Sequence, residues 1–189
     1  MDARIRYTKM VIRENLFEIL KNKTIDKITV KEICEQAQIN RATFYKYYDN
    51  AYDLLDKLEM EALDGLQLKI EKISTGNNRL MEVFRIILEE FKEKKDMYMV
   101  LFSENGDKLF RERIFDLCYR DNMETIKRQF PTIGKEKQEW MYFFLAEGCN
   151  GVLNRWIING MREDIGDVVR FLTELIDNIN NSGKTFLIS

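Results

Sequence analysis

The sequence predicts an all-α protein, built from a three-helix head at the N-terminus and a larger helical body. Apolar residues recur at intervals of three and four almost throughout the 189 residues, and no segment alternates convincingly with a period of two. A single proline and few clustered glycines leave little to interrupt helices. We expect a head over residues 1–50, a body over 51–189, and helix breaks near residues 22–28, 38–40, 49–50, 74–78, 103–107, 131–135 and 161–164.

The composition is typical of a folded protein outside the membrane. Hydrophobic residues make up 45% and charged residues 33% of the chain, a balance that argues against intrinsic disorder. No apolar run approaches the roughly 20 residues that span a bilayer, and the opening residues lack the apolar core of a signal peptide. We therefore expect a cytoplasmic protein with no membrane partner.

The residues that most often carry catalysis or bind metals are scarce. The chain contains no histidine, which removes the commonest general base and metal ligand. Its three cysteines, Cys34, Cys118 and Cys149, are widely spaced and form neither a Cys-x-x-Cys pair nor a disulfide framework, so we expect all three to be reduced. The sequence therefore predicts no enzyme, no metal site and no cofactor.

Charge is distributed unevenly along the chain. Up to Tyr48 there are ten basic and six acidic residues, a net charge of +4, which leaves −6 for the rest because the whole chain carries −2. Such asymmetry suits a small part that meets phosphate and a larger part that does not.

The best-marked helix begins after Thr29. Thr29 and Glu32 have the Thr-x-x-Glu spacing of a capping box, in which each side chain binds the other's free backbone amide. Ile28 and Ile33 flank this box as a hydrophobic staple, and Cys34 falls on the apolar face of the helix. We expect Cys34 to be a small buried hydrophobe and not a reactive thiol.

A second, short helix follows a turn at residues 38–40. Asn40 can cap a helix over residues 41–48, so that two short helices meet across three residues, as in a helix-turn-helix. Phe44 and Tyr48 lie one turn apart and are expected to face inward. The other side chains of this helix are expected to be largely exposed: Arg41, Ala42, Thr43, Tyr45, Lys46 and Tyr47.

These exposed residue types suit contact with double-stranded DNA. The hydroxyl groups of tyrosine and threonine and the ammonium group of lysine reach phosphate oxygens, whereas an arginine at the helix start can bind a guanine edge with two hydrogen bonds. The alternative is a surface helix whose aromatic residues pack against its neighbours. The capping box, the tight turn and the positive charge together favour a helix that reads DNA.

Over about residues 8–58 the chain resembles the TetR family of bacterial transcription regulators. The resemblance rests on LFEIL at 16–20, ITVKEIC at 28–34, AQINRATFYKYY at 37–48 and YDLL at 52–55. It implies a homodimer that binds a palindromic DNA operator through a helix-turn-helix head. It also implies a divergent C-terminal body that dimerises and binds an effector, either a small molecule or a protein, and we interpret the regulator as a repressor.

The family pattern, carried over by position, assigns roles within the head. It implies phosphate contacts at Thr29, Tyr45 and Tyr47 and base contacts at Arg41, Ala42 and Thr43. It implies structural roles for Phe44 and Tyr48. Lys46 is also expected to contact DNA, without an assignment to base or phosphate. Three positions depart from the pattern: Thr24 and Gln38 stand where glycine is usual, and Ala51 stands where a lysine commonly opens the fourth helix. Ala51 removes one expected phosphate contact, and Gln38 implies about 1 kcal/mol of left-handed backbone strain.

The body carries a second resemblance. The segment FFLAEGCNGVLNRW at 143–156, followed by Gly160, is similar to a branch of the family that includes regulators of dihydroxyacetone kinase operons. Some members of that branch act as activators through protein partners. The alternative function is therefore a transcriptional co-activator or sensor that works chiefly through a protein partner.

Aromatic residues and methionines of the body can line an effector pocket, because such side chains adapt to a ligand. Apolar stripes are also the ordinary content of a helical core, so both interpretations stay open. The candidate pocket residues are Phe84, Leu88, Phe91, Met99, Phe102, Phe143 and Trp156.

The last helix carries a heptad seam suited to packing against another helix. Gly148 and Gly151 in the preceding helix would let two backbones approach closely, so we expect these two helices from each subunit to form a four-helix interface. Purely internal packing is the alternative. The seam residues are Ile165, Val168, Leu172, Leu175 and Ile179.

Overall fold

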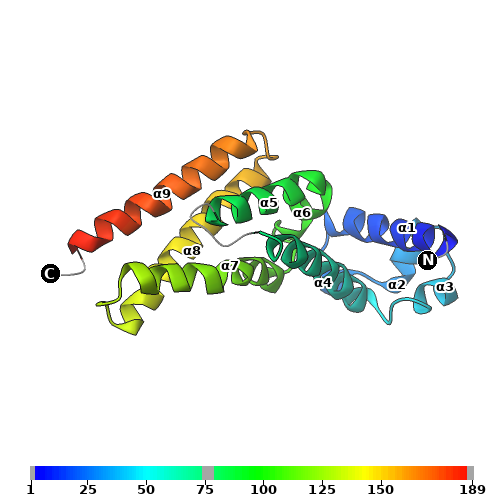
Figure 1. The fold of residues 1–189 in the computed structure, drawn as a ribbon. Helices are drawn as coiled ribbons and strands as arrows, with labels where there is room; N and C mark the ends of the chain where they lie inside the picture. The colour runs from blue at the N-terminus through cyan, green and yellow to red at the C-terminus, as the bar shows by residue number, and fades with distance from the viewer. Residues whose placement is uncertain (1–2, 74–78, 187–189) are drawn as a thin grey trace. The chain divides into compact units, whose positions relative to one another are not determined.

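The computed structural model describes residues 3–73 and 79–186, apart from some side chains of α7 and those at the end of α9 (Figure 1). This part of the chain contains helices and no strand, which confirms the predicted all-α class. The elements are α1 (Ala3–Leu20), the 3-10 helix η1 (Ile25–Lys27), α2 (Val30–Gln36), α3 (Arg41–Tyr45), α4 (Ala51–Ile70), α5 (Arg79–Glu93), α6 (Lys95–Leu101), α7 (Lys108–Gln129), α8 (Lys135–Ile158) and α9 (Ile165–Phe186). None of these described helices is both long and apolar enough to cross a membrane.

Most helix breaks fall where the sequence predicts them. The ends of α1, α2, α6, α7 and α8 all lie at or next to predicted breaks. Helix α3 is shorter than the predicted helix over residues 41–48: it ends at Tyr45, where the connection to α4 begins. The sequence also missed the break between α5 and α6, and the predicted break at 74–78 lies outside the described residues.

Two compact units make up the chain. The first comprises Met1–Gly65 and Asp96–Phe110, and the second comprises Leu66–Lys95 and Arg111–Ser189. Most of α6 therefore belongs to the same unit as α1, α2 and α3, which the periodicity of the sequence did not indicate. The functional division into residues 1–50 and 51–189 stays a prediction.

In the first unit, α1 packs on α2 and α2 packs on α3. Tyr98, Phe102 and Phe110 form a buried aromatic cluster in the same unit, with ring centroids 6.3 to 6.4 Å apart. Gly106 is required in the loop beside them, because a Cβ there would overlap the carbonyl oxygen of Leu101. The completely buried aliphatic and aromatic residues from α1 to α4 include Ile12, Leu16, Leu20, Ile33, Phe44 and Leu54.

In the second unit, α5 packs against α9 (Figure 1). Helix α8 ends in a Schellman motif: Gly160 has φ +85°, and the amides of Gly160 and Met161 donate to the carbonyls of Ile157 and Trp156. This motif turns the chain toward α9. The buried residues of α5 and α9 are Val83, Phe84, Ile87, Leu88, Glu90, Phe91, Val168, Val169, Leu172, Thr173 and Ile176.

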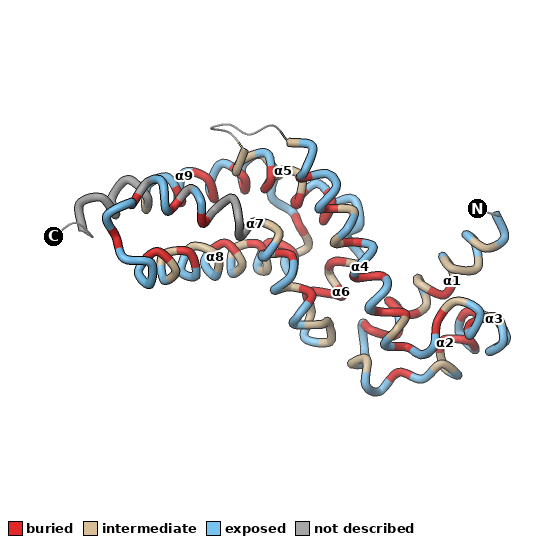
Figure 2. Tube along the Cα trace, turned by 60° about the horizontal axis from the view of Figure 1, so that its bottom comes forward, coloured by how far each residue is buried: buried red, intermediate tan, exposed pale blue. Residues whose placement is uncertain are grey.

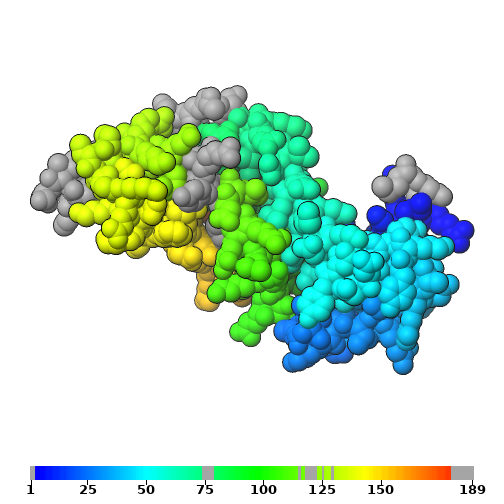
Figure 3. All heavy atoms as spheres, turned by 90° about the horizontal axis from the view of Figure 1, so that it is seen from below, coloured from blue at the N-terminus to red at the C-terminus, as the bar shows by residue number. Residues whose placement is uncertain are grey.

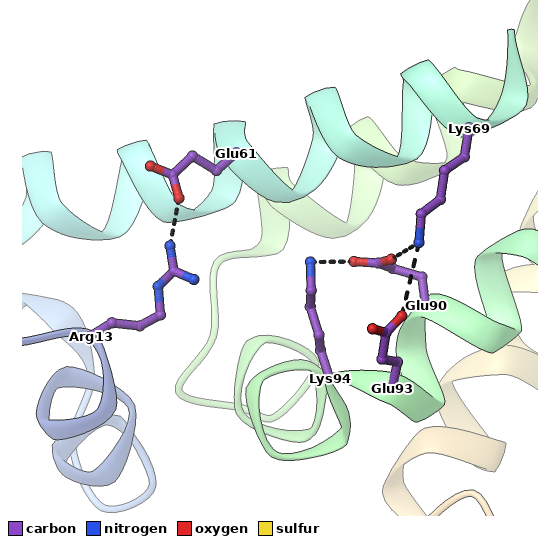
Figure 4. A network of polar contacts seen from close by, with 6 residues as sticks. All are labelled: Arg13, Glu61, Lys69, Glu90, Glu93 and Lys94. Atoms are coloured by element: carbon purple, nitrogen blue, oxygen red, sulfur yellow. Dashed lines mark hydrogen bonds and ion pairs between the residues drawn. The ribbon is translucent and has the colours of Figure 1, made fainter. Parts of the chain in front are cut away.

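Glu90 is a buried carboxylate held by two lysines (Figure 4). Its side chain is 2% exposed, and its two oxygens lie 2.5 Å from the ammonium groups of Lys69 and Lys94. Burial raises the pKa of Glu90, but the hydrogen bonds from the two lysines outweigh it, so the pKa lies below its ordinary value. The buried carboxylate of Glu90 thus links α5 to α4, and both lysines are needed to compensate its charge.

Two of the three cysteines can be placed. Cys34 is free and buried, as predicted, Cys149 is also free and buried, and the side chain of Cys118 lies outside the described residues. Burial raises the pKa of Cys149 to about 11 and also raises the pKa of Cys34. Both are therefore protonated, unreactive thiols near neutral pH.

Candidate nucleic-acid interface

Thr29 caps α2, as the sequence predicts. Its hydroxyl oxygen accepts a hydrogen bond from the backbone amide of Glu32 at 3.2 Å. The carboxylate of Glu32 does not complete the expected reciprocal bond but forms an ion pair with Lys23 at 2.5 Å. Because the oxygen of Thr29 serves as an acceptor within the helix, its exposed O–H can still donate to a ligand.

Asn40 caps α3 and also fixes the side chain of Thr43. The side-chain oxygen of Asn40 accepts from the amide of Thr43 at 2.7 Å and from its hydroxyl at 2.9 Å. The hydroxyl hydrogen of Thr43 is thus used within the helix. What Thr43 can offer outward is an acceptor lone pair and a methyl group.

The turn between α2 and α3 contains a residue with a left-handed backbone. Gln38 has φ +53°, at the position where the family pattern places glycine. The amide of Ile39 donates to the carbonyl of Cys34 at 3.0 Å and closes the end of α2. The strain predicted at Gln38 is therefore present, and the surrounding hydrogen bonds and core maintain it.

Aromatic packing decides which tyrosines are available. Phe44 and Tyr48 are buried, with ring centroids 5.6 Å apart, and burial raises the pKa of Tyr48. Tyr45 is 54% exposed and its ring packs edge-on against Phe44 at 5.8 Å, while Tyr47 is half-buried against Tyr48. The inward-facing Phe44 and Tyr48 and the exposed Arg41, Ala42, Tyr45 and Lys46 therefore match the sequence prediction, whereas Thr43 and Tyr47, expected to be largely exposed, are half-buried.

A lysine of α4 holds the end of this segment. The ammonium group of Lys57 donates to the carbonyl of Tyr47 at 3.2 Å and to the carboxylate of Asp53 at 2.8 Å. It also lies 5.6 Å from the ring centroid of Tyr48. The bond from Lys57, with a further one from the amide of Asp49, holds the pKa of Asp53 below its ordinary range.

Basic side chains of the first unit divide into paired and unpaired ones. Lys21, Lys23 and Lys31 form ion pairs with Glu18, Glu32 and Glu35. Among the described residues, by contrast, the exposed side chains of Arg41 and Lys46 have no carboxylate partner. The positive charge of the helix-turn-helix is therefore available at α3, where Arg41 and Ala42 are exposed at the start of the helix.

The predicted pocket residues are divided between the two units. Phe84, Leu88 and Phe91 are buried on α5 in the second unit, and Trp156 is buried there with its indole N–H directed at the carbonyl of Glu163 at 3.4 Å. The other three residues are placed differently: Met99 and Phe102 belong to the first unit, and Phe143 is 59% exposed on α8. A pocket made from the whole set stays a prediction.

The predicted dimer seam divides in the same way. Val168 and Leu172 are buried within the chain, whereas Leu175 is 40% exposed and Ile165 and Ile179 are half-buried. The seam thus serves the core of the second unit and is only partly available to a partner.

Gly148 and Gly151 are exposed, and a Cβ added at either would meet nothing within 4 Å. The packing of the described chain therefore does not explain why glycine stands there. Large apolar residues that the sequence analysis left out of the seam lie exposed on the same two helices: Trp140, Phe144 and Ile158 on α8, and Phe171 on α9.

Sequence reasoning also missed three polar residues around α3. Lys9 lies 5.6 Å from the ring centroid of Tyr47, and Lys57 and Asp53 form the ion pair described above. The four-residue spacing of Asp53 and Lys57 is a signal that could have found their pair. No local pattern connects Lys9 with Tyr47, because they are 38 positions apart.

Comparison with known proteins identifies a family model and a curated relative that match parts of this chain. Residues 78–178 match the family TetR_C_8, described as a transcriptional regulator C-terminal region. A stretch of 55 residues is 33% identical to the uncharacterized HTH-type transcriptional regulator YxbF of Bacillus subtilis (strain 168). That match covers 29% of this chain and spans only 14% of the relative's length.

Solved structures share the fold over nearly the whole chain. A TetR transcriptional regulator from Streptococcus agalactiae 2603V superposes with a TM-score of 0.67 and 21% identity, covering 93% of this chain and 96% of that one. The dihydroxyacetone kinase operon activator DhaS superposes with a TM-score of 0.60 and 17% identity, covering 92% and 96%. At these identities the likeness is one of fold.

Proposed function

Because the chain belongs to the TetR family of transcriptional regulators, we propose that it binds a palindromic DNA operator as a homodimer and that an effector in the second unit modulates this binding. We further propose that it acts in the cytoplasm as a repressor, by occupying the operator, and that it catalyses no reaction. The observation that carries the proposal is the helix-turn-helix, in which Asn40 caps a short helix that presents Arg41 and Tyr45 outward.

The contacts to DNA divide by chemistry. Arg41 and Ala42, exposed in the first turn of α3, enter the major groove, where a guanidinium can bind guanine with two hydrogen bonds. Thr43 joins them through its methyl group or its acceptor lone pair, since its hydroxyl hydrogen is bound to Asn40. Phosphate contacts come from the hydroxyls of Thr29, Tyr45 and Tyr47, and Lys46 adds a cation beside them.

Exposed apolar residues of α8 and α9 support the proposal of a homodimer. Trp140, Phe143 and Phe144 are each more than half exposed, and Phe171 and Leu175 lie exposed on α9. Large aromatic side chains at the surface of one subunit are stabilised when a partner covers them. The exposed glycines of α8 would allow the close approach of a second copy of that helix.

The effector proposal rests on buried aromatic residues of α5 and α8 in the second unit. An effector that contacts Phe84, Phe91 or Trp156 would have to move side chains that are now packed. Such a ligand shifts the protein between two states only to the extent that it binds one of them better. A small molecule and a protein are the two candidate effectors.

A protein partner is the second candidate, and the aromatic residues of α8 favour it. DhaS, which shares this fold, is named as an activator. If Trp140, Phe143 and Phe144 stay exposed in the homodimer, they are available to another protein. Fluorescence of Trp140 distinguishes burial in the homodimer from exposure to another protein. Burial in the homodimer would move its emission to shorter wavelength as the protein is concentrated, whereas unchanged emission would favour the protein partner.

Selection of duplex DNA from a random pool tests the proposed function. The full chain should enrich a sequence with two inverted half-sites, since a symmetric dimer places two copies of α3 on the duplex. The matched control is Lys21→Ala, which removes an exposed cation already paired with Glu18 and should enrich the same sequence. Failure to enrich any sequence would contradict the proposal.

A further inference from the structure

The first turns of α1 stand out from the core of the first unit. The first buried residue of α1 is Ile12, so the nine described residues before it contribute nothing to the completely buried core. Figure 2 shows these turns in tan and pale blue, and Figure 3 shows them in dark blue at one edge of the first unit. A helical extension that is not needed for burial is free to contact a ligand.

One face of this extension is basic. In a helix with 3.6 residues per turn, Arg6, Lys9 and Arg13 follow one another at spacings of three and four and share a face. Arg13 is neutralised by Glu61, at 2.5 Å between the guanidinium and the carboxylate. Lys9 and Arg6, farther out, have no carboxylate partner among the described residues.

The basic face is directed toward the segment that follows α3. The ammonium group of Lys9 lies 5.6 Å from the ring centroid of Tyr47, so the two side chains are neighbours although they are 38 positions apart in the sequence. Arg6 lies one turn before Lys9 on the same face, about 4.5 Å farther along the helix axis. The position of Tyr47 therefore ties this face to the edge of the helix-turn-helix.

We propose that Arg6 and Lys9 form a second DNA-binding element, which binds phosphates of the duplex next to those bound by Tyr47. The inference rests on the proposed function, because it takes α3 as the element that reads the operator. Two unpaired cations on one face, about 4.5 Å apart along the axis by the helical rise of about 1.5 Å per residue, can both reach backbone phosphates from outside the groove. Such contacts add affinity and carry no sequence information.

The test compares the natural full-length chain with the double variant Arg6→Gln/Lys9→Gln. Two duplexes are used, one carrying the sequence selected from the random pool and one scrambled to the same composition, each titrated at several salt concentrations. The variant should lose affinity for both duplexes by the same factor. Each lost phosphate contact lowers the slope of log K against log salt by about 0.9, so two residues in two subunits should lower it by about 3.6.

Two controls keep the test specific. Arg6→Lys/Lys9→Arg should keep the natural slope, because it preserves both charges. Lys21→Gln, at the other end of α1 and paired with Glu18, should also leave the slope unchanged. Thermal unfolding followed by circular dichroism should be the same for the natural chain and for the variants at Arg6 and Lys9, since both positions precede the first buried residue of α1.

An unchanged slope in Arg6→Gln/Lys9→Gln would overturn the inference. A loss restricted to the selected duplex would also overturn it, because that result means base reading and not phosphate binding. Failure of the proposed function has a different signature: the natural chain would then not distinguish the two duplexes at all.

Discussion

The ammonium group of Lys57 donates a hydrogen bond to the backbone carbonyl of Tyr47, at 3.2 Å, and an ion pair with Asp53 holds that ammonium group in place. This relationship joins the segment that follows α3 to α4. Helix α3 has only five residues, so its orientation depends on such tertiary contacts and not on its own helical stability. Lys57 is therefore a positioning residue for the proposed DNA-reading helix.

Lys57→Met should weaken binding to the selected and scrambled duplexes alike, by roughly fivefold, or about 1 kcal/mol, the size of one hydrogen bond. The salt slope should stay unchanged, because the charge of Lys57 is already paired with Asp53 and does not meet phosphate. Lys57→Arg should restore most of the affinity. A lowered slope in Lys57→Met would mean that this lysine contacts DNA directly.

Gln38→Gly should stabilise the first unit. Glycine adopts φ +53° without the steric cost that glutamine incurs, although its greater freedom in the unfolded chain reduces the gain. We expect an increase of about 0.5 to 1 kcal/mol in the free energy of unfolding, measured by urea denaturation. Gln38→Ala, which keeps the strained Cβ, is the matched control and should give no gain.

Glu90 should make the second unit less stable in acid. The pKa of Glu90 is lower in the folded chain than its ordinary value of 4.5. Its contribution to the free energy of unfolding is therefore fully present above pH 4.5 and is lost as the pH falls through the folded pKa. Glu90→Gln should cost about 1 to 3 kcal/mol near neutral pH, because it removes a charged partner from Lys69 and Lys94. The free energy of unfolding, measured from pH 7 to 3, should then depend less steeply on pH in the variant than in the natural chain. An equally steep dependence would contradict this role of Glu90.

Leu172 and Leu175 should differ in what they stabilise. Leu172 is completely buried within the chain, so Leu172→Ala should lower the free energy of unfolding by about 2 to 5 kcal/mol. Leu175 is 40% exposed, so Leu175→Glu should leave the subunit helical and weaken the proposed dimer instead. Sedimentation of Leu175→Glu beside a Glu174→Gln control measures this, and an unchanged dimer would place the interface elsewhere.

Local signals in the sequence predicted the head well. The caps at Thr29 and Asn40 and the buried Phe44 are each determined by a few neighbouring residues, and the structure confirms all three. The left-handed backbone at Gln38 was expected from the family resemblance, which places glycine there, and it is also confirmed. The reciprocal bond of Glu32 was predicted wrongly, because Lys23, nine residues away, competes for the carboxylate.

Tertiary relationships were harder to predict. An amphipathic helix shows which face is apolar but not which element covers it, so the seam of α9 could not be divided between the core and a partner from its spacing alone. Val168 and Leu172 proved to be buried within the chain, and Phe171, outside the heptad, proved to be exposed. Met99 and Phe102 belong to the first unit for a similar reason, since long-range packing assigns α6 there.

Helix α3 is the element proposed to read DNA, and operator binding by the variants Arg41→Ala and Tyr45→Phe tests this role most directly. Arg41→Ala should cost about 1 to 3 kcal/mol on the selected duplex and relax the preference at one base pair of each half-site, as expected for a lost guanine contact. Tyr45→Phe should weaken the selected and scrambled duplexes alike, because a phosphate contact carries no sequence information. Natural affinity and natural sequence preference in both variants, with Lys21→Ala as the reference, would contradict the assignment of α3 as the reading helix.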